Sequence, residues 1–157
     1  MTKVKGDIQF RFMEEKDLDQ ICQLEEETFS LPWRREDFLQ MIQQEQAVYL
    51  VAEDIQTKQI IGGCGVRNIV GEGEITNVVI RKDYRGQKIA TAMLAALMKE
   101  GTKIGIIHFT LEVRESNQAA IALYQKSGFN IEGTRKNFYE KPVENGLIMW
   151  KRNDETV

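Results

Sequence analysis

Histidine and cysteine are scarce in this chain of 157 residues, and each shortage excludes a kind of chemistry. His108 is the only histidine, which excludes a histidine-based metal site and a serine–histidine–aspartate triad. The two cysteines, Cys22 and Cys64, lie in segments with apolar periodicity and have no CxxC spacing. We expect both to be small buried side chains in a reducing compartment, and we expect no metal.

Proline is equally rare, with only two residues, and there is no linker rich in serine or glycine and no repeat. These absences predict one domain over residues 1–157, closed by a short charged tail at 151–157. Residues 1–10 lack the apolar stretch of a secretory signal, and no apolar run is long enough to cross a bilayer. We therefore expect a cytoplasmic protein without membrane contact.

No excess of positive charge is present, because 21 lysines and arginines face 24 aspartates and glutamates, for a formal net charge of −3. This balance disfavours direct, sequence-blind binding of nucleic acid. It also disfavours a structural protein of the ribosome, which would be basic.

Hydrophobic residues make up 42% of the chain, enough for a core at this length. Apolar alternation predicts strands, and apolar spacings of three and four predict helices. Asp17 is expected to cap the first helix, Leu31-Pro32-Trp33 to end it, and the glycines at 62, 63 and 65 to mark a bulge or close packing. The expected strands are 8–12, 47–52, 60–70, 75–80, 106–113, 129–139 and 147–150; the expected helices are 17–29, one containing Phe38, Leu39 and Ile42, 87–99 and 117–127. This order predicts an α/β fold, with a mixed sheet covered by helices on both faces.

A strand, a basic turn and a helix follow one another between Ile75 and Lys99. The N–H groups at a helix start lack intrahelical partners, and with the positive end of the helix dipole they suit a pyrophosphate. Gly86 and Ala90 would let the ligand approach closely, although a solvated basic turn would have the same sequence. The segment contains neither GxGxxG nor GK[ST], which excludes a Rossmann fingerprint and a P-loop. The basic side chains that would add attraction are Arg81, Lys82, Arg85 and Lys88.

A second group of polar residues follows downstream, where Glu112 ends a strand and Asn117 begins a helix that reaches Tyr124. Each residue has an ordinary explanation, as a solvated strand end, a helix cap and a core ring. A carboxylate with a pKa raised by partial burial can also take a proton from an amine, and a phenol can give one to a leaving thiolate. A covalent route through cysteine is disfavoured, because neither thiol has a basic partner in the sequence.

The segment Arg85-Gly86-Gln87-Lys88-Ile89-Ala90 resembles the acetyl-coenzyme A signature R/Q-x-x-G-x-G/A of the GNAT N-acetyltransferases. Lys88 stands where that signature has its first glycine; it can still offer its backbone N–H if its φ is negative. The resemblance covers essentially the whole chain and points to the ribosomal-protein-alanine N-acetyltransferase branch. The segments similar to that branch are 29–33, 111–117, 120–124, 128–129, 135–139 and 148–150.

The resemblance implies the GNAT acyl-CoA N-acyltransferase fold, with a central mixed, splayed sheet flanked by helices on both faces. It implies direct transfer of acetyl from acetyl-CoA to a protein N-terminal amino group, with the N-terminal alanine of a small-subunit ribosomal protein as the expected acceptor. Glu112 would be the general base and Tyr124 the general acid, and the N–H of Val79 would bind the oxyanion. The residues implied to bind the cofactor are Val78, Val79, Ile80, Gly86, Gln87, Lys88, Ile89, Ala90, Thr91 and Asn117.

The acceptor groove implied by the resemblance contains Leu31, Trp33, Phe138 and Tyr139. Aromatic faces suit an extended peptide better than a polyamine. The acidic residues near these segments, which would attract a basic ribosomal tail, are Glu36, Asp37, Glu140 and Glu144. Two alternatives stay open: a GNAT enzyme for another amine, such as lysine, a polyamine or a small molecule, and a CoA-binding module without catalysis.

Overall fold

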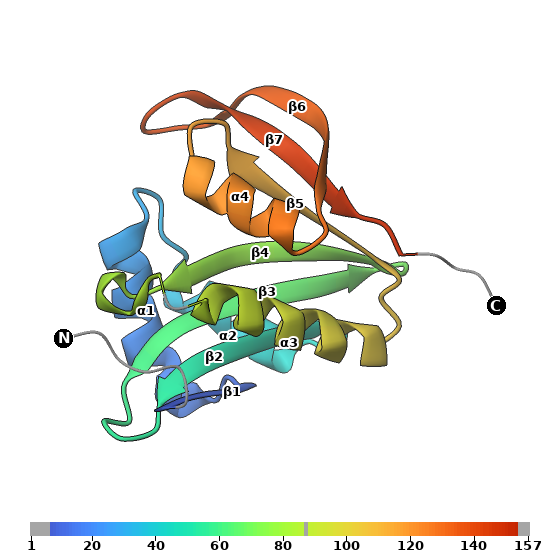
Figure 1. Cartoon of the computed structure of the whole chain (residues 1–157). Helices are drawn as coiled ribbons and strands as arrows, with labels where there is room; N and C mark the ends of the chain where they lie inside the picture. Colours follow the sequence, from blue (N-terminus) through green and yellow to red (C-terminus); the bar gives the residue numbers. More distant parts are fainter. Residues whose placement is uncertain (1–6, 87, 154–157) are drawn as a thin grey trace.

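The computed structural model describes residues 7–86 and 88–153, and a seven-stranded sheet runs through them in the order β1-β2-β3-β4-β5-β7-β6 (Figure 1). Neighbouring strands are antiparallel except β4 and β5, which are parallel. The strands are β1 (Ile8–Phe12), β2 (Ala47–Asp54), β3 (Ile60–Ile69), β4 (Glu72–Ile80), β5 (His108–Arg114), β6 (Asn130–Tyr139) and β7 (Glu144–Lys151); the helices are α1 (Leu18–Thr28), α2 (Arg35–Gln43), α3 (Ile89–Lys103) and α4 (Gln118–Lys126). The predicted mixed sheet is confirmed.

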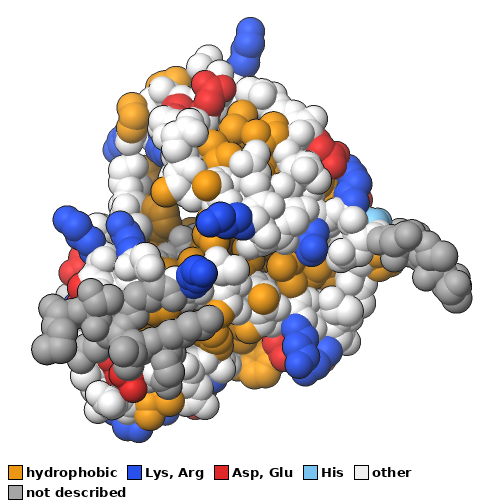
Figure 2. Space-filling view, in the orientation of Figure 1, with side chains coloured by type: hydrophobic (Ala, Val, Ile, Leu, Met, Phe, Trp, Pro, Cys, Tyr) orange, Lys and Arg blue, Asp and Glu red, His pale blue; other side chains and the backbone are white. Residues whose placement is uncertain are grey.

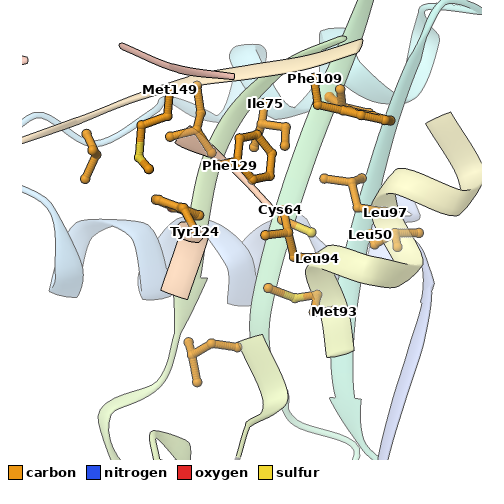
Figure 3. Close-up of a cluster of buried hydrophobic side chains, with 14 of the residues drawn as sticks. Leu50, Cys64, Ile75, Met93, Leu94, Leu97, Phe109, Tyr124, Phe129 and Met149 are labelled. Atoms are coloured by element: carbon orange, nitrogen blue, oxygen red, sulfur yellow. The ribbon is translucent and has the colours of Figure 1, made fainter. Parts of the chain in front are cut away.

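Helices cover both faces of the sheet, as the sequence predicts. On one side α1 and α2 pack against β2 and β4 through a cluster that includes Ile21, Phe38 and Val79. On the other side α3 and α4 pack through a larger cluster that includes Leu97 and Tyr124 (Figures 1 and 3). We call these the α1/α2 face and the α3/α4 face. Alternate residues of each strand contribute to different faces, so the strand pattern decides which side chains meet which helices.

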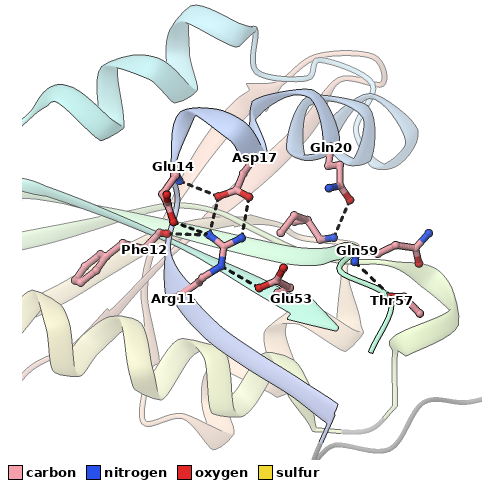
Figure 4. Close-up of polar contacts among 9 residues, drawn as sticks. Arg11, Phe12, Glu14, Asp17, Gln20, Glu53, Thr57 and Gln59 are labelled. Carbon is pink, nitrogen blue, oxygen red and sulfur yellow. Dashed lines mark hydrogen bonds and ion pairs between the residues drawn. The ribbon is translucent and has the colours of Figure 1, made fainter. Parts of the chain in front are cut away.

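The start of α1 is held to the sheet by an arginine, which corrects the expected role of Asp17. Asp17 occupies the N-cap position, yet its carboxylate accepts no hydrogen bond from α1. It accepts two from Arg11, at 2.8 Å each, and one from the N–H of Glu14 (Figure 4). Arg11 also donates to Glu53 on β2, so β1, β2 and the start of α1 are joined. The arginine holds the pKa of Asp17 below its ordinary value against the opposing effect of burial.

The glycines of β3 do mark both a bulge and close packing. A Cβ on Gly65 would lie 2.7 Å from the ring of Tyr49 and 2.8 Å from the hydroxyl of Thr76. The β3–β4 register shifts between Cys64 and Val66, so that Thr76 and Asn77 both stand opposite Gly65. The bulge therefore lies in β4, beside the segment expected to bind the acetyl donor.

The parallel pair β4–β5 separates soon after it begins. Residues 72–74 of β4 pair with residues 108–110 of β5, while residues 75–80 remain paired with β3 alone and 111–114 with β7 alone. The two strands diverge visibly in Figure 1. The resulting gap is the splay that the resemblance implies.

The expected tail begins later than predicted, because Lys151 closes β7. Arg152 then pairs with Glu132 on β6, and the Asn153 side chain donates to the carbonyl of Ile107. Apolar alternation could not predict that the strand continues to Lys151, because Lys151 and Arg152 are both charged. Among the helices of the described residues, none combines the length and apolar character that a membrane span requires.

Candidate active site

The register of β3 and β4 decides which backbone groups face the gap between β4 and β5. The N–H of Arg81 donates to the carbonyl of Ile61 at 2.7 Å, and Val79 pairs with Gly63 two residues along. Hydrogen-bonded pairs alternate along an antiparallel ladder, so the N–H of Val79 also faces β3. This corrects the expectation that Val79 supplies an oxyanion donor. The N–H groups of Val78 and Ile80 face the gap instead.

The start of α3 has the unpaired N–H groups that the basic turn predicts. The helix begins at Ile89 and has no side-chain cap, and Ala92 is the first residue whose N–H reaches back to Lys88. Within the described part of the chain, the N–H groups of Ile89, Ala90 and Thr91 have no partner. This arrangement fits the two phosphates of a pyrophosphate. Gln87, also expected there, lies outside the described residues.

Lys88 adopts the conformation that a glycine in its signature position would favour. Its φ is +62°, so the condition of a negative φ is not met. Gly86 has a φ of +82°, and nothing lies within 4 Å of a Cβ placed there. Both residues therefore use left-handed backbone, which costs a lysine more than a glycine.

The basic turn before α3 is partly held by its own arginines. Arg85 donates from Nε to the carbonyl of Ile80 at 3.0 Å, and Arg81 lies 3.4 Å from Asp83. Lys82 and Lys88 are exposed. On the face shown in Figure 2, hydrophobic side chains lie between the part with α4 and β5–β7 and the part with α3, with lysines and arginines beside them.

Glu112 lies on β5 with one carboxylate oxygen unsatisfied. Its Oε1 is 3.5 Å from Nε of Arg135, while Oε2 is buried and has no hydrogen-bond partner among the described residues. Burial raises the pKa of Glu112, Arg135 lowers it, and the charge of Glu74 raises it. A buried carboxylate oxygen without a donor is rare, and it leaves Glu112 able to accept a proton.

Tyr124 lies on α4 and packs edge-on against Phe129, with the ring centroids 6.1 Å apart (Figure 3). The residue is buried, and burial raises the pKa of its phenol above the ordinary value. The phenol therefore stays protonated at neutral pH and can act as a proton donor. The expectation of a core ring and that of a proton donor are compatible.

Tyr139, at the end of β6, interacts electrostatically with both of these residues. The pKa of Tyr139 is raised to about 12, first by burial and then by the charge of the Glu112 carboxylate. Tyr139 in turn raises the pKa of Tyr124. Tyr139 therefore lies within electrostatic range of both Glu112 and Tyr124.

Asn117 is the N-cap of α4, as expected for an asparagine at the start of a helix. Its side-chain oxygen accepts a hydrogen bond from the N–H of Ala120 at 3.1 Å. The residue is exposed, and its amide nitrogen remains available to a ligand next to α4.

The expected acceptor residues form two separate aromatic groups. Trp33 is half-buried and packs against Phe38 and Tyr49, with centroids 5.2 and 6.4 Å apart, while Leu31 is exposed. The rings of Phe138 and Tyr139 pack edge-on, with their centroids 5.0 Å apart. They lie on β6, at the opposite end of the sheet from β2, which carries Tyr49 of the first group. In the described residues, the ring contacts of Trp33 are with Phe38 on α2 and Tyr49 on β2, so the two aromatic groups do not touch each other.

Two of the acidic residues expected to attract a basic tail have internal partners instead. Glu144 accepts hydrogen bonds from Arg114 at 3.2 Å and from the N–H of Ser116 at 2.6 Å. Asp37 accepts one from the N–H of Arg34 at 2.8 Å. Of the acidic residues named from the sequence, Glu36 and Glu140 are exposed.

Sequence reasoning missed two polar residues on the α1/α2 face. Glu25, on α1, is buried and binds the side chain of Asn77, which stands in the bulge of β4. One signal was available, because Glu25 follows Leu18 and Ile21 on the apolar stripe of the helix. No comparable signal marks Asn77, since its role depends on the bulge.

The splayed sheet and the open helix start are the features expected of an acetyl-CoA-dependent N-acetyltransferase. The model of the acetyltransferase (GNAT) family matches residues 18–129, and the chain belongs to this family. A relative from Haemophilus influenzae, named [ribosomal protein bS18]-alanine N-acetyltransferase, is 32% identical over 85% of this chain and 90% of its own length.

Solved structures agree on the fold. The ribosomal-protein-S18-alanine N-acetyltransferase from Escherichia coli superposes with a TM-score of 0.85 at 28% identity, over 96% of each chain. A spermidine N-acetyltransferase from Vibrio cholerae reaches 0.79 at 20% identity, over 94% of this chain and 95% of its own. At that identity the second likeness shows the fold alone.

Proposed function

We propose that this enzyme transfers the acetyl group of acetyl-CoA directly to the N-terminal amine of a protein, and that the acceptor is the N-terminal alanine of a ribosomal protein. The buried, unpartnered Oε2 of Glu112 carries the catalytic part of the proposal. The names of the relatives at 28–32% identity support the acceptor. The spermidine enzyme shares only the fold, so the other-amine alternative gains nothing from it.

Three groups of residues would bind acetyl-CoA. The N–H groups of Ile89, Ala90 and Thr91 would bind the pyrophosphate, with Gly86 and Lys88 shaping the turn before them. The gap-facing backbone of Val78 and Ile80 would hold the pantetheine arm and the thioester, since these groups have no strand partner across the gap. Asn117 would bind the arm through its free amide nitrogen.

The acid and the base would act from opposite sides of the thioester. Glu112 takes a proton from the amine, whose nitrogen bonds to the acetyl carbon, directly or through water. As the carbon–sulfur bond breaks, Tyr124 donates its proton to the departing thiolate. An N–H of Val78 or Ile80 would stabilise the oxyanion, in place of the N–H of Val79. Burial raises the pKa of the Cys64 thiol, which argues against an acetyl-cysteine route.

Leu31, Trp33, Phe138 and Tyr139 would line the acceptor groove. Leu31 and Phe138 are exposed, so they are placed to contact the first residues of a peptide. The two hydrophobic clusters pack against the same seven-stranded sheet, so the segments with Leu31 and Trp33 and with Phe138 and Tyr139 would belong to one domain.

A steady-state comparison tests the proposal. The acceptors are a peptide with a free N-terminal alanine, the same peptide with a blocked N-terminus and an internal lysine, and spermidine. We expect the free terminus to have the highest kcat/KM by a wide margin. Preference for the lysine or for spermidine would refute the acceptor, and no turnover with any amine would favour a CoA-binding module.

A further inference from the structure

A second buried carboxylate lies on the α1/α2 face and takes no part in the proposed proton transfers. Glu25, in the last turn of α1, is only 2% exposed. Its Oε2 accepts a hydrogen bond from the backbone N–H of Trp33 at 3.1 Å, and its Oε1 accepts one from Nδ2 of Asn77. One side chain therefore joins α1, the segment between α1 and α2, and strand β4.

Asn77 connects this carboxylate to the edge of β4 that faces the gap. It stands in the bulge opposite Gly65, and its Oδ1 accepts a hydrogen bond from the Thr76 hydroxyl at 3.1 Å. The next residue is Val78, whose backbone faces the gap between β4 and β5. A displacement of Asn77 would therefore move the strand edge at which the thioester is proposed to lie.

Trp33 connects the same carboxylate to the acceptor side. Its ring lies against Phe38 and Tyr49, and the guanidinium of Arg67 stands 5.4 Å from the ring centroid. Its backbone N–H donates a hydrogen bond to Glu25, so the main chain of Trp33 is held by α1 while its ring is held by other residues. This anchor lies two residues from Leu31, which is proposed to line the same acceptor groove.

Stability of the fold alone does not require a carboxylate at this position. Leu18 and Ile21 precede Glu25 on the apolar stripe of α1, where another apolar side chain would suit the core. Burial raises the pKa of Glu25, and the charge of Asp37 raises it too, so holding the charge there is costly. The buried hydroxyl of Tyr49 makes no hydrogen bond with any described residue, so it does not stabilise the Glu25 carboxylate. The geometry that this carboxylate specifies, with one oxygen on Trp33 and the other on Asn77, is what an apolar side chain there would not supply.

We infer that Glu25 is a positioning residue for the acceptor, setting the acceptor segment at Trp33 relative to the donor edge of β4 through Asn77. The inference rests on the proposed function, because it assigns these two segments to acceptor and donor. Glu25 touches neither substrate, so its effect appears in how the peptide binds.

A side-chain exchange tests the inference. Glu25→Gln leaves one acceptor oxygen for two donors, so the new NH2 group must face either the Trp33 N–H or the Asn77 amide nitrogen. Asn77→Asp places two carboxylates together, so each single variant disrupts the pair. In the double variant the new amide donates to the new carboxylate, and the amide oxygen still accepts from Trp33. The matched control is Glu26→Gln, which changes the exposed neighbour on the same helix.

We expect each single variant to raise the KM of the N-terminal peptide about tenfold, the usual effect of one lost charge-assisted hydrogen bond. The double variant should return most of that loss, and Glu26→Gln should match the wild type. The Kd of CoA, measured by calorimetry, should change less than the peptide KM in every variant, because the N–H groups proposed to bind the pyrophosphate lie at the start of α3, away from Glu25 and Asn77. Asn77→Ala serves as a second single variant if Glu25→Gln folds poorly.

Two results would overturn the inference. In one, the single variants keep the wild-type peptide KM and only melt at lower temperature, which is the behaviour of a purely structural contact. In the other, the double variant is no better than the singles. Failure of the proposed function is distinguishable, because the wild type itself would then fail to acetylate the peptide.

Discussion

Glu112 and Tyr124 lie on opposite faces of β5. Leu111 and Val113, the strand neighbours of Glu112, pack in the same cluster as Tyr124, so alternation turns Glu112 toward the α1/α2 face. Glu112 belongs to the part of β5 that no longer pairs with β4, so it borders the gap between these strands. In the proposed reaction the amine would approach from the α1/α2 face and the thiolate would leave near the α3/α4 face, so the two proton transfers need not share one space.

Replacement of the proposed base should reduce turnover. Glu112→Gln keeps the size of the side chain and removes its ability to accept a proton, so kcat should fall about 100-fold or more. The Kd of CoA, measured by calorimetry, should not change, because the proposed cofactor contacts lie on β4, α3 and α4. If turnover remains near the wild-type value at saturating substrates, Glu112 is structural.

The acidic limb of the pH profile should report the Glu112 carboxylate. Burial raises its pKa, and a base works only when deprotonated, so kcat/KM should fall as pH drops through that raised value. Arg135 lowers the pKa of Glu112, and Arg135→Gln should therefore move the limb to higher pH. The limb should be absent in Glu112→Gln. A limb unchanged by Arg135→Gln would contradict the assignment.

Removal of the Tyr124 hydroxyl should also slow the chemical step. Tyr124→Phe preserves the edge-on contact with Phe129 but removes the donor to the thiolate, so kcat should fall about tenfold or more. Rapid-quench kinetics would show whether the acetyl-transfer step itself has slowed. Phe129→Leu, which changes the contact and keeps the hydroxyl, provides the comparison and should lower stability more than turnover.

Substitutions at the two left-handed residues before α3 should have opposite effects on stability: Gly86→Val should lower it and Lys88→Gly should raise it. Gly86→Val forces a β-branched residue to a φ of +82°, at a cost of roughly 1–2 kcal/mol, and should weaken CoA binding. Lys88→Gly relieves a φ of +62° and should raise the Tm by a few degrees, with a smaller effect on the Kd of CoA. Calorimetry and thermal melting measure both. Equal losses of CoA affinity in the two variants would contradict this ranking.

The hairpin between β3 and β4 contains a residue ill suited to its conformation. Val70 has a φ of +53° and is 99% exposed, and Gly71 follows with a φ of +85°. Positive φ at both central residues is typical of turns that favour Asn-Gly. Val70→Asn should therefore stabilise the protein by about 0.5–1 kcal/mol without changing kcat/KM, as measured by denaturant unfolding. A lower midpoint would mean that Val70 makes a stabilising contact.

Local patterns in the sequence predicted most elements of the fold. The strand expected at 106–113 is β5, whose Phe109, Leu111 and Val113 are buried, and the helix expected at 117–127 is α4, which is followed by Gly128 with a φ of +100°. Periodicity succeeds there because each strand and helix meets the core on a single face. The elements that differ, such as the cap at Asp17, depend on a partner elsewhere in the chain, in this case Arg11.

The sequence by itself determined most strands and helices, the basic helix start at α3 and the candidates Glu112 and Tyr124, since each depends on residues close together along the chain. Only the tertiary structure decided that the N–H of Val79 faces β3, because strand register is set by pairing between distant segments. It alone brought Glu25 against Asn77, 52 residues away, and left one oxygen of Glu112 buried without a partner. Burial and hydrogen bonding between distant residues arise only when the chain has folded, and these interactions give the candidate site its chemistry.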